Sequence, residues 1–160
     1  MFYMHKFKNI FRVESTRLKE WDYSNPWWYY VTICTNNHFP HFGEINDGKM
    51  ELNELGKTAV KFWTEIPNHF KNTELDCFVV MPNHIHGIII ITGKEETPCM
   101  ASLGNIIGKF KGAVTRWAMN NNYINFKWQT RFYDRIIRGE KELFNIRKYI
   151  EENPVKWEGK

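Results

Sequence analysis

The segment LDCFVVMPNHIHGIIIIT, residues 75–92, carries the clearest indication of the fold. Its two apolar runs, Leu75–Met81 and His84–Thr92, are rich in residues that favour β-strands. Pro82-Asn83 between them is a pair typical of turns. The segment therefore predicts an antiparallel β-hairpin.

His84 and His86 are the sharpest local feature of this hairpin. Side chains two residues apart on a strand point to the same face, so both imidazoles project together while Ile85 enters the opposite layer. Two neutral imidazoles on one face make half of a metal site. The spacing alone also allows a structural interpretation, in which one histidine is a hydrogen-bonded core residue and the other is exposed.

Helices and strands are predicted on both sides of the hairpin from apolar periodicity and breaker residues. In chain order, we expect a strand over Trp27–Thr35, a loop over His38–Met50, a helix from Asn53 to Pro67, a helix from Ser102 to Asn120, and an extended segment over Arg131–Arg138. The order of these elements implies an α+β domain with an antiparallel sheet and helices grouped on one face, which resembles a ferredoxin-like layout.

A third helix is expected from about Glu140 to Glu152, because Pro154 disfavours helical geometry at Asn153. Tyr149 and Asn153 are four residues apart and share a helix face. Alone, each has an ordinary structural interpretation: a ring at the edge of the core, and a helix stop.

The length indicates one domain, and its charge is unevenly distributed along the sequence. The 160 residues suit a single domain over 1–160, with its core at about 27–157. The net charge of +4 is concentrated between residues 101 and 138, a segment that contains seven basic residues and one acidic residue, Asp134. These candidate DNA-binding residues are Lys109, Lys111, Arg116, Lys127, Arg131, Arg135 and Arg138. Interleaved with aromatic residues, they indicate a phosphate-binding surface, or else a solvated helix face.

Cysteine usage and hydropathy predict where the protein resides. Cys34, Cys77 and Cys99 are far apart, which favours a reducing cytosol and argues against a zinc site made of thiolates. The amino-terminal residues have too many charges for a signal peptide. Every apolar run is far shorter than the ~20 residues of a membrane span. We therefore expect a cytoplasmic protein with no membrane partner.

Taken together, two separated motifs resemble those of a known family. VVMPNHIHGIIII resembles the histidine–hydrophobic–histidine signature of HUH endonucleases, in the form found in single-tyrosine, IS200-like transposases. Downstream, KWQTRFYDRIIRGEKELFNIRKYIEENPVKW is similar to the carboxy-terminal block of REP-associated tyrosine transposases. The resemblance covers roughly residues 28–157.

The resemblance implies a function and a site. His84 and His86 would be metal ligands, Asn153 would supply a third ligand through its carboxamide oxygen, and Tyr149 would be the nucleophile. The cofactor would be Mg²⁺ or Mn²⁺. Insertion-sequence relatives usually have glutamine in place of Asn153, so the asparagine favours the REP-associated branch.

By the same resemblance, the protein would be a transposase that cleaves and joins single-stranded DNA near hairpins through a 5′-phosphotyrosine. It would act as a monomer or homodimer, and the asparagine favours a tyrosine that works in cis. Two alternatives remain at this point: a domesticated or inactive regulator that binds DNA hairpins, and a nicking protein of the replication-initiator type.

Overall fold

The structure is a computed structural model that describes residues 21–93 and 102–157. Four antiparallel strands form its main sheet, in the spatial order β4 (Thr73–Val80), β5 (His84–Ile91), β1 (Trp27–Cys34) and β6 (Tyr133–Ile136). The predicted hairpin is β4–β5, and β5 lies in the interior of the sheet with all eight residues buried. The strand order is that of a ferredoxin-like sheet.

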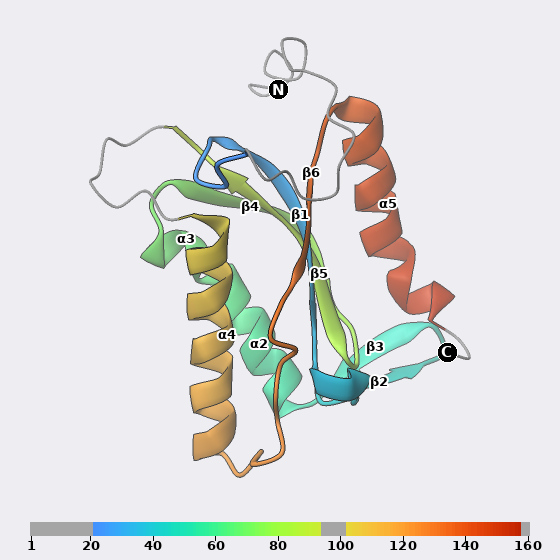
Figure 1. Ribbon diagram of the computed structural model, residues 1–160. Coiled ribbons are helices and arrows are strands. Elements are labelled where there is room, and N and C mark those ends of the chain that lie inside the picture. The colour runs from blue at the N-terminus through green and yellow to red at the C-terminus, as the bar shows by residue number, and fades with distance from the viewer. Residues whose placement is uncertain (1–20, 94–101, 158–160) are drawn as a thin grey trace.

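Two helices cover one face of the sheet, and a third lies on the other (Figure 1). α2 (Glu54–Thr64) links β1 to β4, and α4 (Leu103–Asn120) links β5 to β6. Because such crossovers are right-handed, both helices reach the same face. α5 (Glu140–Lys156) lies against the opposite face. We expected the helices on one face, but this holds only for the two crossover helices.

The face beneath α2 is packed around a tryptophan. Trp63 is fully buried and lies against Gly87 of β5, where a Cβ atom would come within 2.3 Å of the indole. Glycine at this position therefore lets α2 approach the sheet closely. The expected caps of the two crossover helices are present: the Asn53 side chain accepts from the Gly56 N–H, and Ser102 accepts from Asn105.

The expected loop over 38–50 is in fact largely structured. It contains a short 3-10 turn, η1 (Asn36–His38), and a hairpin of β2 (Gly43–Asn46) and β3 (Lys49–Leu52). Asp47-Gly48 connects the two strands, with φ of 49° and 70°. Asp-Gly favours this turn because both residues tolerate positive φ.

The two proline boundaries also differ from expectation. Pro67 does not end a helix: it lies in the first turn of a separate short helix, α3 (Ile66–His69), where a missing N–H costs nothing. Pro154 lies inside α5, and Asn153 remains helical. Burial of Ile150 and Asn153 against the sheet offsets the preference of a pre-proline residue for extended backbone.

The last strand, β6, spans only Tyr133–Ile136 within the expected 131–138. Cys34 and Cys77 are free thiols, while Cys99 lies outside the described residues. Of the helices in the described ranges, none has the length and apolar character that crossing a membrane requires.

Candidate active site

The two histidines share one sheet face with hydroxyl groups of the neighbouring strand. In the β1–β5 register, Thr32 lies opposite His86 and Cys34 lies opposite His84. Tyr133 of β6 lies opposite Thr32 in turn. Directly opposite residues in an antiparallel pair point to the same side, so a polar strip crosses this face beneath α5.

His86 is held by one of its ring nitrogens. Its Nδ1 lies 2.8 Å from the Tyr30 hydroxyl and 2.9 Å from Thr32 Oγ1. Its Nε2 is buried and has no hydrogen-bond partner within the described residues. When Nδ1–H donates to a hydroxyl, Nε2 carries the lone pair that a metal ion requires. A buried nitrogen without a partner costs stability, so this atom is suited to bind a metal ion.

His84 is oriented by the residue before it. Its Nδ1 lies 2.6 Å from Asn83 Oδ1, while Asn83 Nδ2 donates to the His38 carbonyl at 3.0 Å. Because the carboxamide oxygen only accepts, His84 carries its proton on Nδ1, and Nε2 keeps its lone pair. This is the tautomer of a histidine that binds a metal through Nε2.

Burial keeps both imidazoles neutral. It lowers the pKa of His84 to about 4, with His38 contributing in the same direction and a hydrogen bond to Asn153 opposing it. Burial and then the neighbouring His84 lower the pKa of His86 to about 3. Both rings are therefore neutral near pH 7, as metal ligands must be.

α5 presents three residues, one turn apart, along the histidine pair. The Tyr149 ring centroid lies 5.3 Å from that of His86, and the Trp157 ring lies 5.4 Å from His84. Asn153, between them, is 7% exposed, and its side chain raises the pKa of His84, opposing the effect of burial. The Tyr149 side chain is half exposed, which leaves its hydroxyl open to a substrate. All four predicted residues are thus brought together.

Ion pairs fix α5 against the sheet. Arg147 makes two hydrogen bonds to the Asp76 carboxylate, at 2.7 and 3.1 Å. Near the start of the helix, Glu142 accepts from the Arg138 N–H at 2.8 Å and pairs with Arg135 at 2.6 Å. The bidentate geometry of Arg147 restricts how the helix can rotate over the histidines.

A cleft of about 830 Å³ opens beside Tyr149 and His86. It receives Arg135 and Arg138 from the predicted basic set, together with Tyr133, Lys141 and Asn145. Glu142 also lines the cleft and pairs with Arg135. The excess of basic side chains beside Tyr149 suits an anionic substrate such as a phosphate group.

The other basic residues are dispersed. Lys109 and Arg116 line a groove between α4 and α3, on the far side of the sheet, and the Lys109 ammonium lies over the Phe70 ring. Lys111 is tied to the Gln129 carbonyl at 2.6 Å. Lys127 and Arg131 are exposed. The structure therefore does not gather the predicted basic set on one surface.

The donor set suits a divalent cation. Two imidazole nitrogens and one carboxamide oxygen contain no thiolate, which fits Mg²⁺ or Mn²⁺ among other divalent ions. Within the described residues, no three His, Cys, Asp or Glu side chains cluster as a metal site. A site here thus depends on Asn153 as the third protein ligand.

Tyr30, Thr32, Asn83 and Trp157 are site residues that sequence reasoning missed. The sequence pattern assigns Asn83 only to a turn. Tyr30 and Thr32 alternate with core residues of β1, a pattern that predicts their face but not the histidine opposite them.

Acid should destabilise the metal-free protein through the two histidines. Their pKa values are lowered in the folded state, so the unfolded chain binds protons first as pH falls below about 6.5. From pH 6.5 to 5 we expect each histidine to remove about 2 kcal/mol from the free energy of unfolding. Urea unfolding in chelator at several pH values measures this loss. The His84→Gln, His86→Gln double variant should show a shallower decline, and an equally steep one would contradict the assignment.

Comparison with known proteins places this site in a family. The chain matches the family model "Transposase IS200 like" over residues 51–153. It is 38% identical over 160 residues to an uncharacterized protein of Haemophilus influenzae (strain ATCC 51907 / DSM 11121 / KW20 / Rd), covering 90% of this chain and 89% of that protein.

Two solved structures share the fold. One is a REP-associated tyrosine transposase bound to a REP hairpin, with a TM-score of 0.64 and 18% identity over 91% of this chain and 75% of that one. The other, from Deinococcus radiodurans R1, is described as a transposase, with a TM-score of 0.53 and 16% identity over 84% of this chain and 96% of that one. The predicted α+β fold is thereby confirmed. The family model spans both the histidine pair and the Tyr149–Asn153 turn, and the chain belongs to the IS200-like transposase family.

Proposed function

We propose that this protein is a metal-dependent endonuclease and strand transferase for single-stranded DNA, which cleaves near hairpins through a covalent 5′-phosphotyrosine. The observation that carries the proposal is the placement of Tyr149 and Asn153, one helical turn apart, over buried His84 and His86. We assign the protein to the REP-associated branch because of Asn153. The relative whose structure is described as bound to a REP hairpin supports a hairpin substrate.

His84 and His86 would hold a divalent cation, Mg²⁺ or Mn²⁺, through their Nε2 atoms, and Asn153 would add its carboxamide oxygen. When bound, the ion supplies Lewis-acid polarisation of the scissile phosphate. Tyr30, Thr32 and Asn83 keep the imidazoles oriented through their Nδ1 atoms.

The Tyr149 phenol oxygen attacks the phosphorus atom. A bond forms between this oxygen and phosphorus, the bond from phosphorus to the 3′ oxygen breaks, and the 3′ oxygen leaves as a hydroxyl after taking up a proton. The phenol proton is released to solvent. Arg138 and Lys141 in the cleft would offset the negative charge of the phosphate, whereas Arg135 is paired with Glu142. Reversal of the same step by a different 3′ hydroxyl joins two strands.

A covalent adduct tests the proposal directly. A hairpin library with randomised single-stranded flanks is labelled at the 3′ end in one sample and at the 5′ end in another, then incubated with protein and Mn²⁺. A 5′-phosphotyrosine makes the 3′-labelled DNA migrate with the protein on a denaturing gel, while the 5′ label appears in a shortened fragment. Retardation on a native gel without either product would instead favour a hairpin-binding regulator.

We further infer that Tyr149 acts in cis. Within one chain, α5 already brings the Tyr149 ring to 5.3 Å from His86 of the same chain. Mixing the His84→Ala and Tyr149→Phe proteins should therefore give no adduct. A swapped α5 would create one composite site in each mixed dimer, so recovered cleavage would contradict the cis arrangement.

Arg138, in the cleft beside Tyr149, and the pair Lys109 and Arg116, in the groove beside α4, should contact different parts of the DNA. Arg138→Gln should reduce the slope of log K against log salt by about 0.7 on a plain single strand, if it contacts one phosphate. Lys109→Gln with Arg116→Gln should reduce the slope only on probes with a duplex stem, by about 0.9 for each phosphate that this pair neutralises. Fluorescence anisotropy at four salt concentrations measures both slopes. An unchanged slope on both probes for the α4 pair would remove α4 from the DNA surface.

A further inference from the structure

A cleft and a cavity lie at opposite ends of the histidine pair. The cleft, of about 830 Å³, contains Tyr149 and His86. The cavity, of about 760 Å³, is lined by Asn83 and Trp157, both of which also border His84. A DNA strand whose scissile phosphate lies at the histidines therefore extends into the cleft on one side and into the cavity on the other.

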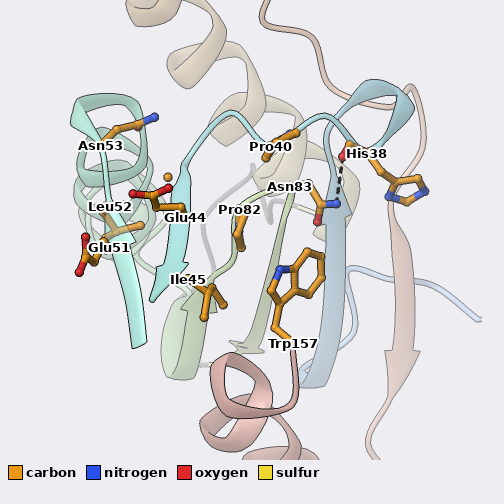
Figure 2. Close-up of a pocket in the computed structure, with 11 residues that line it drawn as sticks. His38, Pro40, Glu44, Ile45, Glu51, Leu52, Asn53, Pro82, Asn83 and Trp157 are labelled. Atoms are coloured by element: carbon orange, nitrogen blue, oxygen red, sulfur yellow. Dashed lines mark hydrogen bonds between the residues drawn. The ribbon is translucent and has the colours of Figure 1, made fainter. Parts of the chain in front are cut away.

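The indole of Trp157 gives the cavity a flat aromatic surface. Figure 2 shows this ring between Ile45 and Asn83. Glu44 and Glu51 also line the cavity, but they lie on the hairpin face opposite to Ile45, because alternate residues of a strand point to opposite faces. In Figure 2 both carboxylates are directed away from the indole. A nucleobase can therefore stack on Trp157 without approaching either of them.

The cleft and the cavity differ in charge. Arg138 and Lys141 line the cleft, together with Asn145. Lys141 and Asn145 precede Tyr149 by two turns and one turn of α5, on the same helix face. Among the described residues that line the cavity, none is Lys or Arg. The cleft therefore suits the phosphates of a strand, while the cavity suits a base.

The geometry of phosphoryl transfer decides which part of the strand enters which of the two. The attacking and leaving oxygens lie roughly in line, on opposite sides of phosphorus. The Tyr149 oxygen attacks from the cleft, so the 3′ oxygen leaves on the side of His84 and Trp157. The nucleotide that carries this 3′ oxygen then lies in the cavity, and the nucleotide that keeps the 5′ phosphate lies in the cleft.

We propose that single-stranded DNA crosses the site with one polarity, 5′ to 3′ from the cavity to the cleft, and that Trp157 stacks on the base of the nucleotide whose 3′ oxygen leaves. This base is named −1, and the base on the other side of the scissile phosphate is named +1. The proposal rests on the proposed function. After cleavage, the downstream strand is bonded to Tyr149 and held through its phosphates, while stacking on Trp157 keeps the free 3′ hydroxyl in place for rejoining.

Removal of single bases tests this polarity. A hairpin DNA that forms the adduct is taken from the randomised library, and the length of its 5′-labelled fragment identifies the scissile phosphate. Copies with an abasic nucleotide at −1 or at +1 are then bound, in Mg²⁺, to Tyr149→Phe protein with and without Trp157→Ala. Fluorescence anisotropy measures Kd. Loss of base −1 should weaken binding about tenfold when Trp157 is present and leave it almost unchanged when Trp157 is replaced. Loss of base +1 should weaken both proteins equally.

Phe144→Ala is the matched control, because Phe144 is another exposed aromatic residue of α5 and lines neither the cleft nor the cavity. In the Tyr149→Phe protein it should keep the tenfold loss at −1. Trp157→Phe should retain part of this loss, since a smaller ring still stacks. Thermal unfolding of each variant checks that the fold is intact.

Dependence of the Trp157 effect on base +1 would reverse the polarity and overturn the inference. Equal losses at −1 with and without Trp157 would overturn it as well. Either result leaves the proposed function standing, because the unchanged protein has already formed the adduct with this DNA. Failure of every library member to form an adduct would overturn the proposed function, and this inference with it.

Discussion

Tyr149→Phe is expected to eliminate the covalent protein–DNA adduct and strand cleavage entirely. The substitution removes the phenol oxygen that forms the bond to phosphorus under the proposed function, while the ring keeps its position beside His86. The side chain is 46% exposed, so the loss of one hydroxyl should change the free energy of unfolding by about 1 kcal/mol or less. DNA affinity should be nearly unaffected. The denaturing-gel assay with 3′-labelled DNA measures the adduct.

Tyr133→Phe is the matched control for this result. Tyr133 lines the same cleft and is 48% exposed, but it belongs to β6 and not to α5. Its loss should leave the adduct in place. Persistence of the adduct in Tyr149→Phe and its loss in Tyr133→Phe would transfer the nucleophile to Tyr133.

Replacement of His86 by Ala is expected to reduce both Mn²⁺ binding and cleavage below detection. The substitution removes the buried Nε2, which has no hydrogen-bond partner in the described part of the chain. It also removes the hydrogen-bond partner of the Tyr30 and Thr32 hydroxyls, so the free energy of unfolding should fall as well. Mn²⁺ binding followed by electron paramagnetic resonance gives a readout that does not depend on DNA or on activity.

Tyr30→Phe should have a smaller effect on the same measurement. Loss of one hydrogen bond to Nδ1 weakens the orientation of the ring, and such supporting residues typically contribute about 10- to 100-fold in metal affinity. His69→Ala, at an exposed position on α3, should bind Mn²⁺ as the unchanged protein does. Undiminished Mn²⁺ binding by His86→Ala, or full cleavage in excess chelator, would contradict a metal site at the histidines.

Local chemistry made much of the fold and the candidate site predictable. The turn pair Pro82-Asn83 between apolar runs was sufficient for β4–β5, and the two-residue period placed His84 and His86 on one face. The four-residue spacing of Tyr149 and Asn153 likewise placed them on one helix face. The β2–β3 hairpin was missed because its strands are short and half-exposed, although Asp47-Gly48 is a recognisable turn signal.

Pairings between distant segments were beyond the reach of any local pattern. Nothing in residues 27–34 shows that Thr32 lies opposite His86, since register depends on the whole sheet. Packing and the Arg147–Asp76 ion pair decide on which face of the sheet α5 lies. As a result, Arg138 lines the cleft beside α5, while Lys109 lies on the opposite face of the sheet.

Residues close in sequence thus specified the β4–β5 hairpin, the helix faces and the types of side chain available for chemistry, because periodicity and turn propensity act over a few residues. Contact between Tyr149 and His86, 63 positions apart, the hydrogen bonds of Tyr30 and Thr32 to His86, and the cavity beside Trp157 were decided by the tertiary structure alone. The reason is that burial, hydrogen-bond partners and enclosed space arise only when segments distant in the chain pack against one another.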